Sequence, residues 1–304
     1  MALDPAFRTV LDTLEQAGAV PLVRNGDAVA TRAHYRELSM ARRGPGFVPE
    51  QVADVADGTV PGPGGDVPVR TYRPADDTGA TVVYLHGGGW VMGDVDTHDP
   101  VCRRVTNATG ATVVSVDYRL APEHPHPAAL DDADAVLRSV AGGSGPIGLA
   151  GDSAGASVAA GLALRARDAG VPVAGQLLFY PATDPTASQP SITANGSGYF
   201  LTATDMRFFW EQYLPGGAGA DDPEIALLGA DVRGVAPAVI ATAEFDPLRD
   251  EGRAYAAHLE RAGVPVRRVD GPGLIHGYAA FLGVVDGAEN AASTALTEFR
   301  RLLA

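Results

Sequence analysis

Apolar residues recur along the chain in short runs, and longer stretches with helical spacing separate most of them. A short apolar or alternating run is typical of a strand, whereas apolar positions three and four apart indicate a helix with one buried face. Strands are predicted at 67–73, 81–86, 112–117, 147–150, 176–180, 238–243 and 264–269. Helices are predicted at 5–17, 31–42, 99–109, 128–140, 154–168, 248–262 and 288–303.

Strands that alternate with helices predict an α/β fold, in which a central, mostly parallel sheet is flanked by helices on both faces. An α/β fold of 304 residues commonly has one core, and we expect residues 1–304 to form a single domain. Ligands bind such sheets at the carboxyl ends of the strands. Residues that directly follow predicted strands are therefore the first candidates for a functional site.

A serine lies between two glycines where a predicted strand gives way to a predicted helix, in the sequence Gly151-Asp152-Ser153-Ala154-Gly155. A serine oxygen can attack a carbonyl carbon only if a tight, strained turn holds it above the sheet. The two glycines would leave room for that close approach of the backbone. Glycine-flanked serines also arise by chance in a chain with 37 glycines, so this motif needs support from elsewhere.

Support comes from the motif His-Gly-Gly-Gly-Trp at 86–90, directly after a predicted strand. Bare N–H groups in such a loop could bind the oxyanion of a tetrahedral intermediate, together with the first N–H of the helix after the serine. The expected donors are Gly88, Gly89 and Ala154, with Gly87 as a further candidate. A phosphate-binding loop is the alternative, but the sequence lacks both a Gly-Lys-Ser/Thr motif and a Gly-x-Gly-x-x-Gly motif that opens a helix.

Seven histidines compete for the role of catalytic base. His276 is favoured because it lies in a glycine-rich loop after the last predicted strand, where the chain order serine, acid, histidine places the base. Asp246 follows the predicted strand 238–243 and is the favoured acid. Asp184 follows the predicted strand 176–180 and is the alternative acid.

These motifs resemble those of the hormone-sensitive-lipase-like esterases of the α/β-hydrolase fold, in their bacterial GDSAG group. The stretches 117–125 and 246–252, which read DYRLAPEHP and DPLRDEG, add to the resemblance. The resemblance implies an α/β-hydrolase fold with a helical cap over the active site. We expect this cap to be built from about 1–45 and 183–220, and the second segment carries an aromatic-rich run.

The resemblance also implies a serine carboxylesterase for esters with short or medium acyl chains. Ser153 would attack the ester carbonyl and form an acyl-enzyme, His276 would take and return the proton, and Asp246 would orient the imidazole. Trp90 and Tyr278 flank the catalytic loops and are candidates for pocket walls or for the core. No metal or organic cofactor is expected, because the sequence has no His-x-x-x-His pair and no cysteine cluster.

Charge limits the expected partners. The net charge of −14, from 37 acidic against 23 basic residues, argues against nucleic acid and anionic membranes, since both attract basic surfaces. The sequence has neither an apolar stretch of membrane-spanning length nor a signal-like start, so a cytoplasmic location is the default expectation. A homodimer formed through an exposed edge strand is left open.

Other functions also stay open from sequence alone. A deacetylase or amidase, or an acyltransferase acting on one natural product, would use the same residues, and product analysis with added alcohols would separate transfer from hydrolysis. A non-catalytic receptor for a small molecule belongs to another class. Receptors that resemble this family lose the histidine, whereas this chain retains Ser153, Asp246 and His276.

Overall fold

The computed structural model describes residues 2–44 and 46–304, so Met1 and Pro45 lie outside the described residues. Its centre is an eight-stranded sheet with the strand order β1-β2-β4-β3-β5-β6-β7-β8. Strands β1 and β2 form an antiparallel pair, β2 is antiparallel to β4, and the remaining neighbours are parallel. The strands are Asp54–Gly62, Gly65–Arg73, Thr81–Leu85, Thr112–Val116, Ile147–Asp152, Gly175–Phe179, Ala238–Phe245 and Val266–Ile275.

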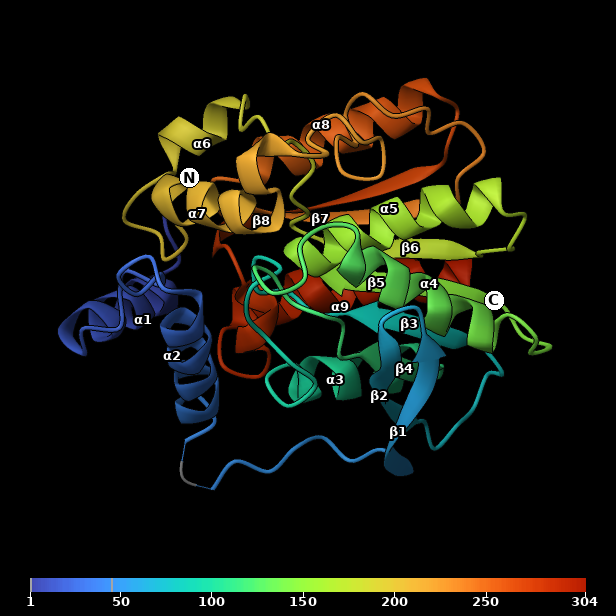
Figure 1. The fold of residues 1–304 in the computed structure, drawn as a ribbon. Coiled ribbons are helices and arrows are strands. Elements are labelled where there is room, and N and C mark those ends of the chain that lie inside the picture. Colours follow the sequence, from blue (N-terminus) through green and yellow to red (C-terminus); the bar gives the residue numbers. More distant parts are fainter. Residues whose placement is uncertain (1, 45) are drawn as a thin grey trace.

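Helices cover both faces of the sheet (Figure 1). Buried side chains of α4, α5 and α8 pack on one face and those of α3 and α9 on the other. The predicted α/β architecture, with a mostly parallel sheet between helices, is therefore confirmed. The helices α1 to α9 are Pro5–Gln16, Ala28–Ala41, Asp99–Thr109, Ala128–Val140, Ala154–Asp168, Pro190–Ala194, Ala203–Tyr213, Arg249–Arg261 and Asp286–Leu302.

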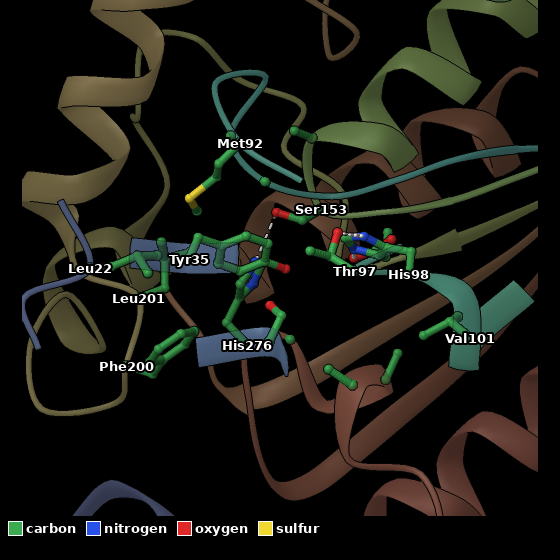
Figure 2. A pocket seen from close by; sticks show the side chains of 18 of the residues that line it. Leu22, Tyr35, Met92, Thr97, His98, Val101, Ser153, Phe200, Leu201 and His276 are labelled. Atoms are coloured by element: carbon green, nitrogen blue, oxygen red, sulfur yellow. Dashed lines mark hydrogen bonds and ion pairs between the residues drawn. The ribbon is translucent and has the colours of Figure 1, made fainter. Parts of the chain in front are cut away.

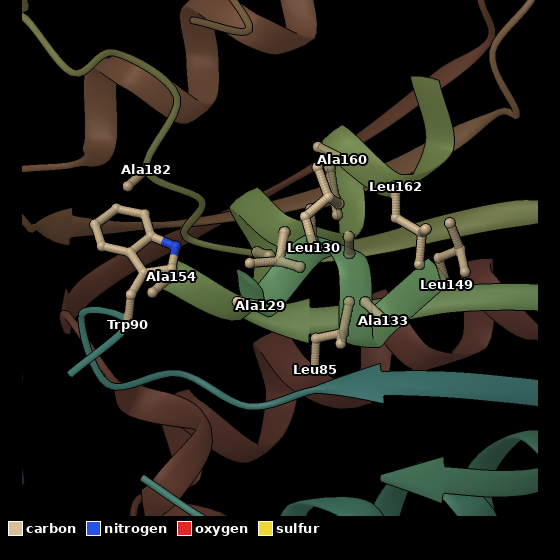
Figure 3. Packing of buried hydrophobic residues seen from close by; sticks show 14 of the residues in the cluster. Leu85, Trp90, Ala129, Leu130, Ala133, Leu149, Ala154, Ala160, Leu162 and Ala182 are labelled. Carbon is tan, nitrogen blue, oxygen red and sulfur yellow. The ribbon is translucent and has the colours of Figure 1, made fainter. Parts of the chain in front are cut away.

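The central strands are buried on both faces, which explains their continuous apolar runs. All six residues of β5 are buried. Figure 3 shows Leu85 and Leu149 of the sheet beneath Leu130 of α4 and Leu162 of α5, and each of these four side chains is at most 1% exposed. This packing holds the start of α5 directly above the end of β5, at the position of the predicted nucleophile.

Two strands differ from the prediction. The hydrophobic pattern did not reveal β1, because this edge strand is mostly exposed and contains no apolar run. Strand β8 continues to Ile275 through Gly271, Pro272 and Gly273, which the sequence suggested to be a loop. Proline and glycine are tolerated there because β8 is the other edge of the sheet, and a register irregularity separates its pairings with Ala243 and Phe245.

The remaining helices lie at one end of the molecule. Helices α1 and α2 from the N-terminal part, and α6 and α7 between β6 and β7, gather on the left in Figure 1. Asp27 begins α2 by accepting hydrogen bonds from two backbone N–H groups, and Thr202 begins α7 with a reciprocal capping box. The caps fix where these two helices begin, and all four helices lie beside the carboxyl ends of the parallel strands (Figure 1).

Candidate active site

Ser153 occupies the sharp turn between β5 and α5. Its backbone has φ 54° and ψ −123°, a conformation that is strained for any residue with a side chain. The turn is tight enough that a Cβ atom on Gly151 would lie 2.7 Å from the carbonyl oxygen of Leu85, and one on Gly155 only 2.0 Å from the same oxygen. Both flanking positions therefore require glycine, for the steric reason that the sequence suggested.

Ser153, His276 and Asp246 form a continuous chain of hydrogen bonds. The Oγ of Ser153 lies 2.8 Å from Nε2 of His276 (Figure 2), and Nδ1 of His276 lies 2.8 Å from Oδ2 of Asp246. Asp246 is fully buried, and its other oxygen accepts a hydrogen bond from the N–H of Leu248. A carboxylate bound to Nδ1 holds the imidazole with its proton on Nδ1, which leaves Nε2 free to accept the serine proton.

Asp184, the alternative acid, has other partners. Its carboxylate accepts hydrogen bonds from the backbone and side chains of Thr186 and Ser188. Burial raises the pKa of Asp184, but these hydrogen bonds outweigh it and keep the pKa below its usual value. The structure thus gives Asp184 a role in folding its own loop and brings Asp246 to the histidine.

The glycine loop after β3 lies beside the serine. Gly88 has φ 128° and a Cβ there would lie 2.0 Å from the carbonyl oxygen of Met92, while a Cβ on Gly89 would lie 2.3 Å from the ring of Phe209. Within the described residues, the N–H groups of Gly88 and Gly89 have no hydrogen-bond acceptor. The N–H of Gly87 differs, because it donates to Asp152 at 3.0 Å.

Asp152 joins this loop to the nucleophile turn. Its carboxylate accepts hydrogen bonds from Tyr84 Oη at 2.8 Å and from Gly87, and its second oxygen lies 3.5 Å from Nε2 of His98. Burial raises the pKa of Asp152, but His98, Tyr84 and Gly87 outweigh it and keep the pKa below its usual value. The sequence predicts a structural role for Asp152 on one ground, namely that Asp152 directly precedes the serine in the turn.

His86 is buried beside the same glycine loop and contacts it directly. Its ring stacks on Tyr118, with centroids 4.2 Å apart, and its Nδ1 lies 2.9 Å from the carbonyl oxygen of Gly87. Burial lowers the pKa of His86 to about 4, so the ring is neutral at physiological pH. The hydroxyl of Tyr118 donates to the carbonyl oxygen of His86 at 2.6 Å. Sequence reasoning gave His86 to the glycine loop without identifying its partner Tyr118.

A cavity of about 180 Å³ lies above Ser153 and His276. Trp90 lines it and also stacks in parallel on Tyr213, with centroids 4.6 Å apart. Tyr278, the second candidate for a pocket wall, is fully buried instead against Phe179 and Tyr180. Side chains that the sequence did not assign to the site also line the cavity, among them Leu22, Tyr35, Phe200, Leu201, Met206 and Phe209.

Within the described residues, no group of three or more histidine, cysteine, aspartate and glutamate side chains is arranged to hold a metal ion. Within the same residues, none of the helices combines the length and the apolar character that crossing a bilayer requires. The single cysteine, Cys102, is buried in α3, and burial raises the pKa of its thiol.

Comparisons with known proteins agree with the geometry. A family model described as alpha/beta hydrolase fold matches residues 82–280. The chain is 40% identical to the carboxylesterase NlhH of Mycobacterium tuberculosis, covering 99% of this chain and 96% of that protein. It is 36% identical to the ethyl acetate hydrolase of Pseudomonas putida, covering 95% and 96%.

A solved structure gives the same result. The hyperthermophilic esterase from the archaeon Pyrobaculum calidifontis superimposes with a TM-score of 0.89 at 38% identity, over 98% of this chain and 99% of that one. The family model, the relatives and the solved structure all agree with the motifs found in the sequence. The chain therefore belongs to the hormone-sensitive-lipase-like family of carboxylic ester hydrolases with the α/β-hydrolase fold.

Proposed function

We propose that this carboxylesterase hydrolyses its substrates with Ser153 as nucleophile, His276 as general base and acid, and Asp246 as the residue that orients the histidine. The observation that carries the proposal is the chain of two 2.8 Å hydrogen bonds from Asp246 through His276 to the serine oxygen. Such a chain lets the imidazole accept the serine proton as the Oγ–C bond forms, and the buried carboxylate stabilises the imidazolium.

The oxyanion of the tetrahedral intermediate binds the N–H groups of Gly88, Gly89 and Ala154 in this proposal. Support comes from the absence of competing acceptors for the two glycines among the described residues, and from the position of Ala154 at the first turn of α5. The N–H of Gly87 is already bound to Asp152, so we leave it out of the oxyanion hole. Its contribution is to hold the loop in place.

The intermediate then collapses to the acyl-enzyme. His276 returns its proton to the oxygen of the leaving alcohol, the C–O bond of the ester breaks, and the acyl group stays on Ser153. Water repeats the attack with His276 again as base, and the acid product leaves. The residues that hold this chemistry come from the ends of β5, β7 and β8 and from the loop after β3.

A cap over this site is a further part of the proposal, built from about 1–45, of which Met1 and Pro45 lie outside the described residues, and from 183–220. Support comes from Leu22 and Tyr35 of the first segment and Phe200, Leu201 and Phe209 of the second, because these side chains line the cavity above Ser153. The preference for short and medium acyl chains stays a prediction, which esters of graded chain length test.

A cytoplasmic location and a homodimer stay predictions. The acidic net charge of −14 supports the first only in that it disfavours anionic membranes as partners. A second copy would pair one of its strands with the edge strand β8, since the outer hydrogen-bonding groups of β8 have no neighbouring strand in the described sheet. Cell fractionation and sedimentation of the purified protein test these two predictions.

The first experiment measures hydrolysis of p-nitrophenyl esters from acetyl to palmitoyl. We expect the highest kcat/KM with short or medium chains, and a loss of about a millionfold in kcat for Ser153→Ala. Ser139→Ala is the matched control, because Ser139 lies on α4 and bonds only to its own helix. Ester hydrolysis by Ser153→Ala at the rate of the unaltered protein would contradict the proposed nucleophile.

A further inference from the structure

Helix α2 presents a polar face to the catalytic cavity. Tyr35, Ser39, Arg42 and Arg43 all line the cavity. The first three are four and three residues apart, which places them on the same side of the helix, and Arg43 directly follows the C-cap of α2. None of these residues was identified from sequence. Figure 2 shows the ring of Tyr35 reaching into the cavity near Ser153 and His276.

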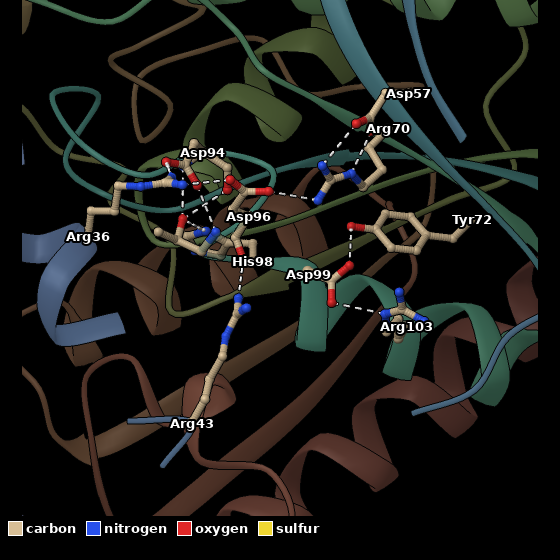
Figure 4. Close-up of polar contacts among 11 residues, drawn as sticks. Arg36, Arg43, Asp57, Arg70, Tyr72, Asp94, Asp96, His98, Asp99 and Arg103 are labelled. Carbon is tan, nitrogen blue, oxygen red and sulfur yellow. Dashed lines mark hydrogen bonds and ion pairs between the residues drawn. The ribbon is translucent and has the colours of Figure 1, made fainter. Parts of the chain in front are cut away.

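The two arginines belong to the minority of arginines that have no carboxylate partner among the described residues. Most arginines of the described residues pair with a carboxylate, as Arg36 of α2 does with Asp94 and Asp96. Within the same described residues, neither Arg42 nor Arg43 has a carboxylate oxygen at ion-pair distance. Asp94 and Asp96 pair instead with Arg36 and Arg70, and Arg70 also pairs with Asp57 (Figure 4).

The contacts of the two arginines are neutral. Arg42 donates to the Oγ of Ser39 at 3.1 Å, and its guanidinium carbon lies 5.0 Å from the centre of the Phe281 ring. Arg43 donates to the backbone carbonyl oxygen of Asp96, as Figure 4 shows. Each guanidinium therefore keeps donors that no anion uses within the described residues.

The cavity holds no competing negative charge that could satisfy them. Among the described residues that line it, Asp152 is the only carboxylate. One oxygen of that carboxylate accepts hydrogen bonds from Tyr84 and Gly87, and the other lies 3.5 Å from Nε2 of His98. The cavity thus combines an apolar part with two positive charges, inside a protein whose net charge is −14.

Helix stabilisation does not account for this arrangement. Cations near the C-terminus of a helix are favourable because they interact with its last carbonyl groups. Arg42 is the C-cap of α2, but its side chain bonds to the hydroxyl of Ser39, and Arg43 reaches a carbonyl that is 53 residues away in sequence. Arg42, which is exposed, and Arg43, which is half-buried, both line the cavity.

We propose that the substrate of this esterase carries an anionic group, of the carboxylate type, which Arg42 and Arg43 bind at the α2 side of the cavity. A guanidinium offers two parallel N–H donors that match a carboxylate, and pairing is stronger in a partly enclosed site than in water. The hydroxyl groups of Tyr35 and Ser39 complete the polar face. This inference rests on the proposed ester hydrolysis and deepens it by naming the class of ester.

The test compares esters of equal shape that differ in charge. The first pair is p-nitrophenyl hydrogen glutarate and p-nitrophenyl 5-methylhexanoate, which places the charge on the acyl side. The second pair is 4-carboxyphenyl butanoate and 4-isopropylphenyl butanoate, which places it on the alcohol side. The measured quantity is the ratio of kcat/KM for the anionic ester to kcat/KM for its neutral partner.

In at least one pair we expect Arg42→Gln/Arg43→Gln to lower this ratio about fivefold or more, and Arg43→Lys to lower it less, because the charge remains. Arg261→Gln is the matched control, since it removes one charge from the exposed end of α8. Salt raised from about 20 mM to about 500 mM should also lower the ratio in the unaltered protein. An unchanged ratio in the double variant for both pairs would overturn the proposal.

Equilibrium binding separates this inference from the proposed hydrolysis. Glutaranilic acid and 5-methylhexananilide are uncleaved amide analogues of the first pair, and titration of the folded Ser153→Ala protein gives their affinities. Preferential binding of the anionic analogue that disappears in the arginine variant would support the inference even if no ester were hydrolysed. Equal affinities for both analogues, before and after the arginine changes, would count against it even in an active esterase.

Discussion

Ser153, Gly88 and Gly89 on one side of the cavity are held by backbone geometry, whereas Tyr35 and Arg42 on the other side are held by the side-chain contacts of α2. We call the first side the floor, made of 86–90, 151–155, Asp246 and His276, and the second side the α2 wall, made of Tyr35, Ser39, Arg42 and Arg43. The floor residues directly follow strands of the sheet. Strand hydrogen bonds and close backbone contacts at the glycines therefore hold their backbone in position.

The α2 wall is attached differently. Arg32 of α2 donates to the carbonyl oxygens of Val91 at 2.8 Å and Ala121 at 3.1 Å, and it pairs with Glu123 at 2.9 Å. Arg36 adds pairs with two aspartates. Partly exposed ion pairs are individually weak. The proposed chemistry therefore uses groups that a rigid backbone frame holds, whereas the proposed substrate preference uses a helix that side-chain contacts anchor.

The largest effect is expected on the floor. Asp246→Asn should lower kcat about 10⁴-fold, because an amide cannot hold the histidine in the required tautomer or stabilise its positive charge. Asp184→Asn is the matched control, since Asp184 also follows a strand and is buried, but its carboxylate bonds to residues of its own loop. Steady-state kinetics on a p-nitrophenyl ester measures both, and a larger loss for Asp184→Asn would reverse the assignment of the acid.

Adding a methyl group at Gly155, in the turn that holds Ser153, should disrupt the backbone of the floor. Gly155→Ala would place a Cβ 2.0 Å from the carbonyl oxygen of Leu85 and 2.4 Å from that of His86. We expect a loss of about 3 kcal/mol or more in the free energy of unfolding, because backbone on both sides must move. Gly170→Ala, at φ +70° with nothing within 4 Å, should cost only about 1 kcal/mol. Denaturant unfolding compares them, and equal losses would show that the close approach has no special cost.

A buried carboxyl behind the cavity makes stability depend on pH. Glu251 is fully buried, and one of its oxygens accepts from the N–H groups of Thr183 and Asp184. Burial raises the pKa of Glu251 from 4.5 to about 8. The folded protein thus binds more protons than the unfolded chain between these values, so this group lowers the free energy of unfolding as pH rises through that window.

Glu251→Gln should remove this dependence. The variant and the unaltered protein should be similarly stable near pH 5, where the folded-state carboxyl is already protonated, and the variant should gain up to a few kcal/mol relative to it above pH 8. Urea unfolding at both pH values measures the difference between the two proteins, which cancels the contributions of other groups. A difference that stays constant with pH would contradict the raised pKa.

The smallest effect is expected from loosening the α2 wall. Arg32→Met removes two hydrogen bonds to carbonyl oxygens and one ion pair, which should cost about 1 to 2 kcal/mol of anchoring. We expect KM to rise several-fold with a smaller change in kcat, because the floor is untouched. Arg138→Met on α4 is the control, where a surface pair with Asp134 is lost. A fall in kcat without any change in KM would show that the wall and the floor are coupled.

Local sequence patterns predicted many of the helices and strands and the approximate location of the site. Helices α3, α4, α5 and α8 could be predicted to within a residue because amphipathic spacing and their ends are local features. Each member of the proposed triad directly follows a parallel strand, in the predicted chain order Ser153, Asp246, His276. Because parallel strands end at the same edge of the sheet, the three side chains meet there. The exposed strand β1 could not be found in this way, because an edge strand without an apolar face leaves no periodic signal.

By itself, the sequence determined where the backbone must turn sharply and which residue types stand at those turns, because both depend on a few neighbouring residues. Only the tertiary structure decided that the N–H of Gly87 is taken by Asp152, that Tyr278 lies in the core, and that Arg42 and Arg43 reach the cavity. These outcomes depend on how elements distant in sequence pack together. Packing is set by the whole core at once, so no local pattern can specify which side chains meet across it.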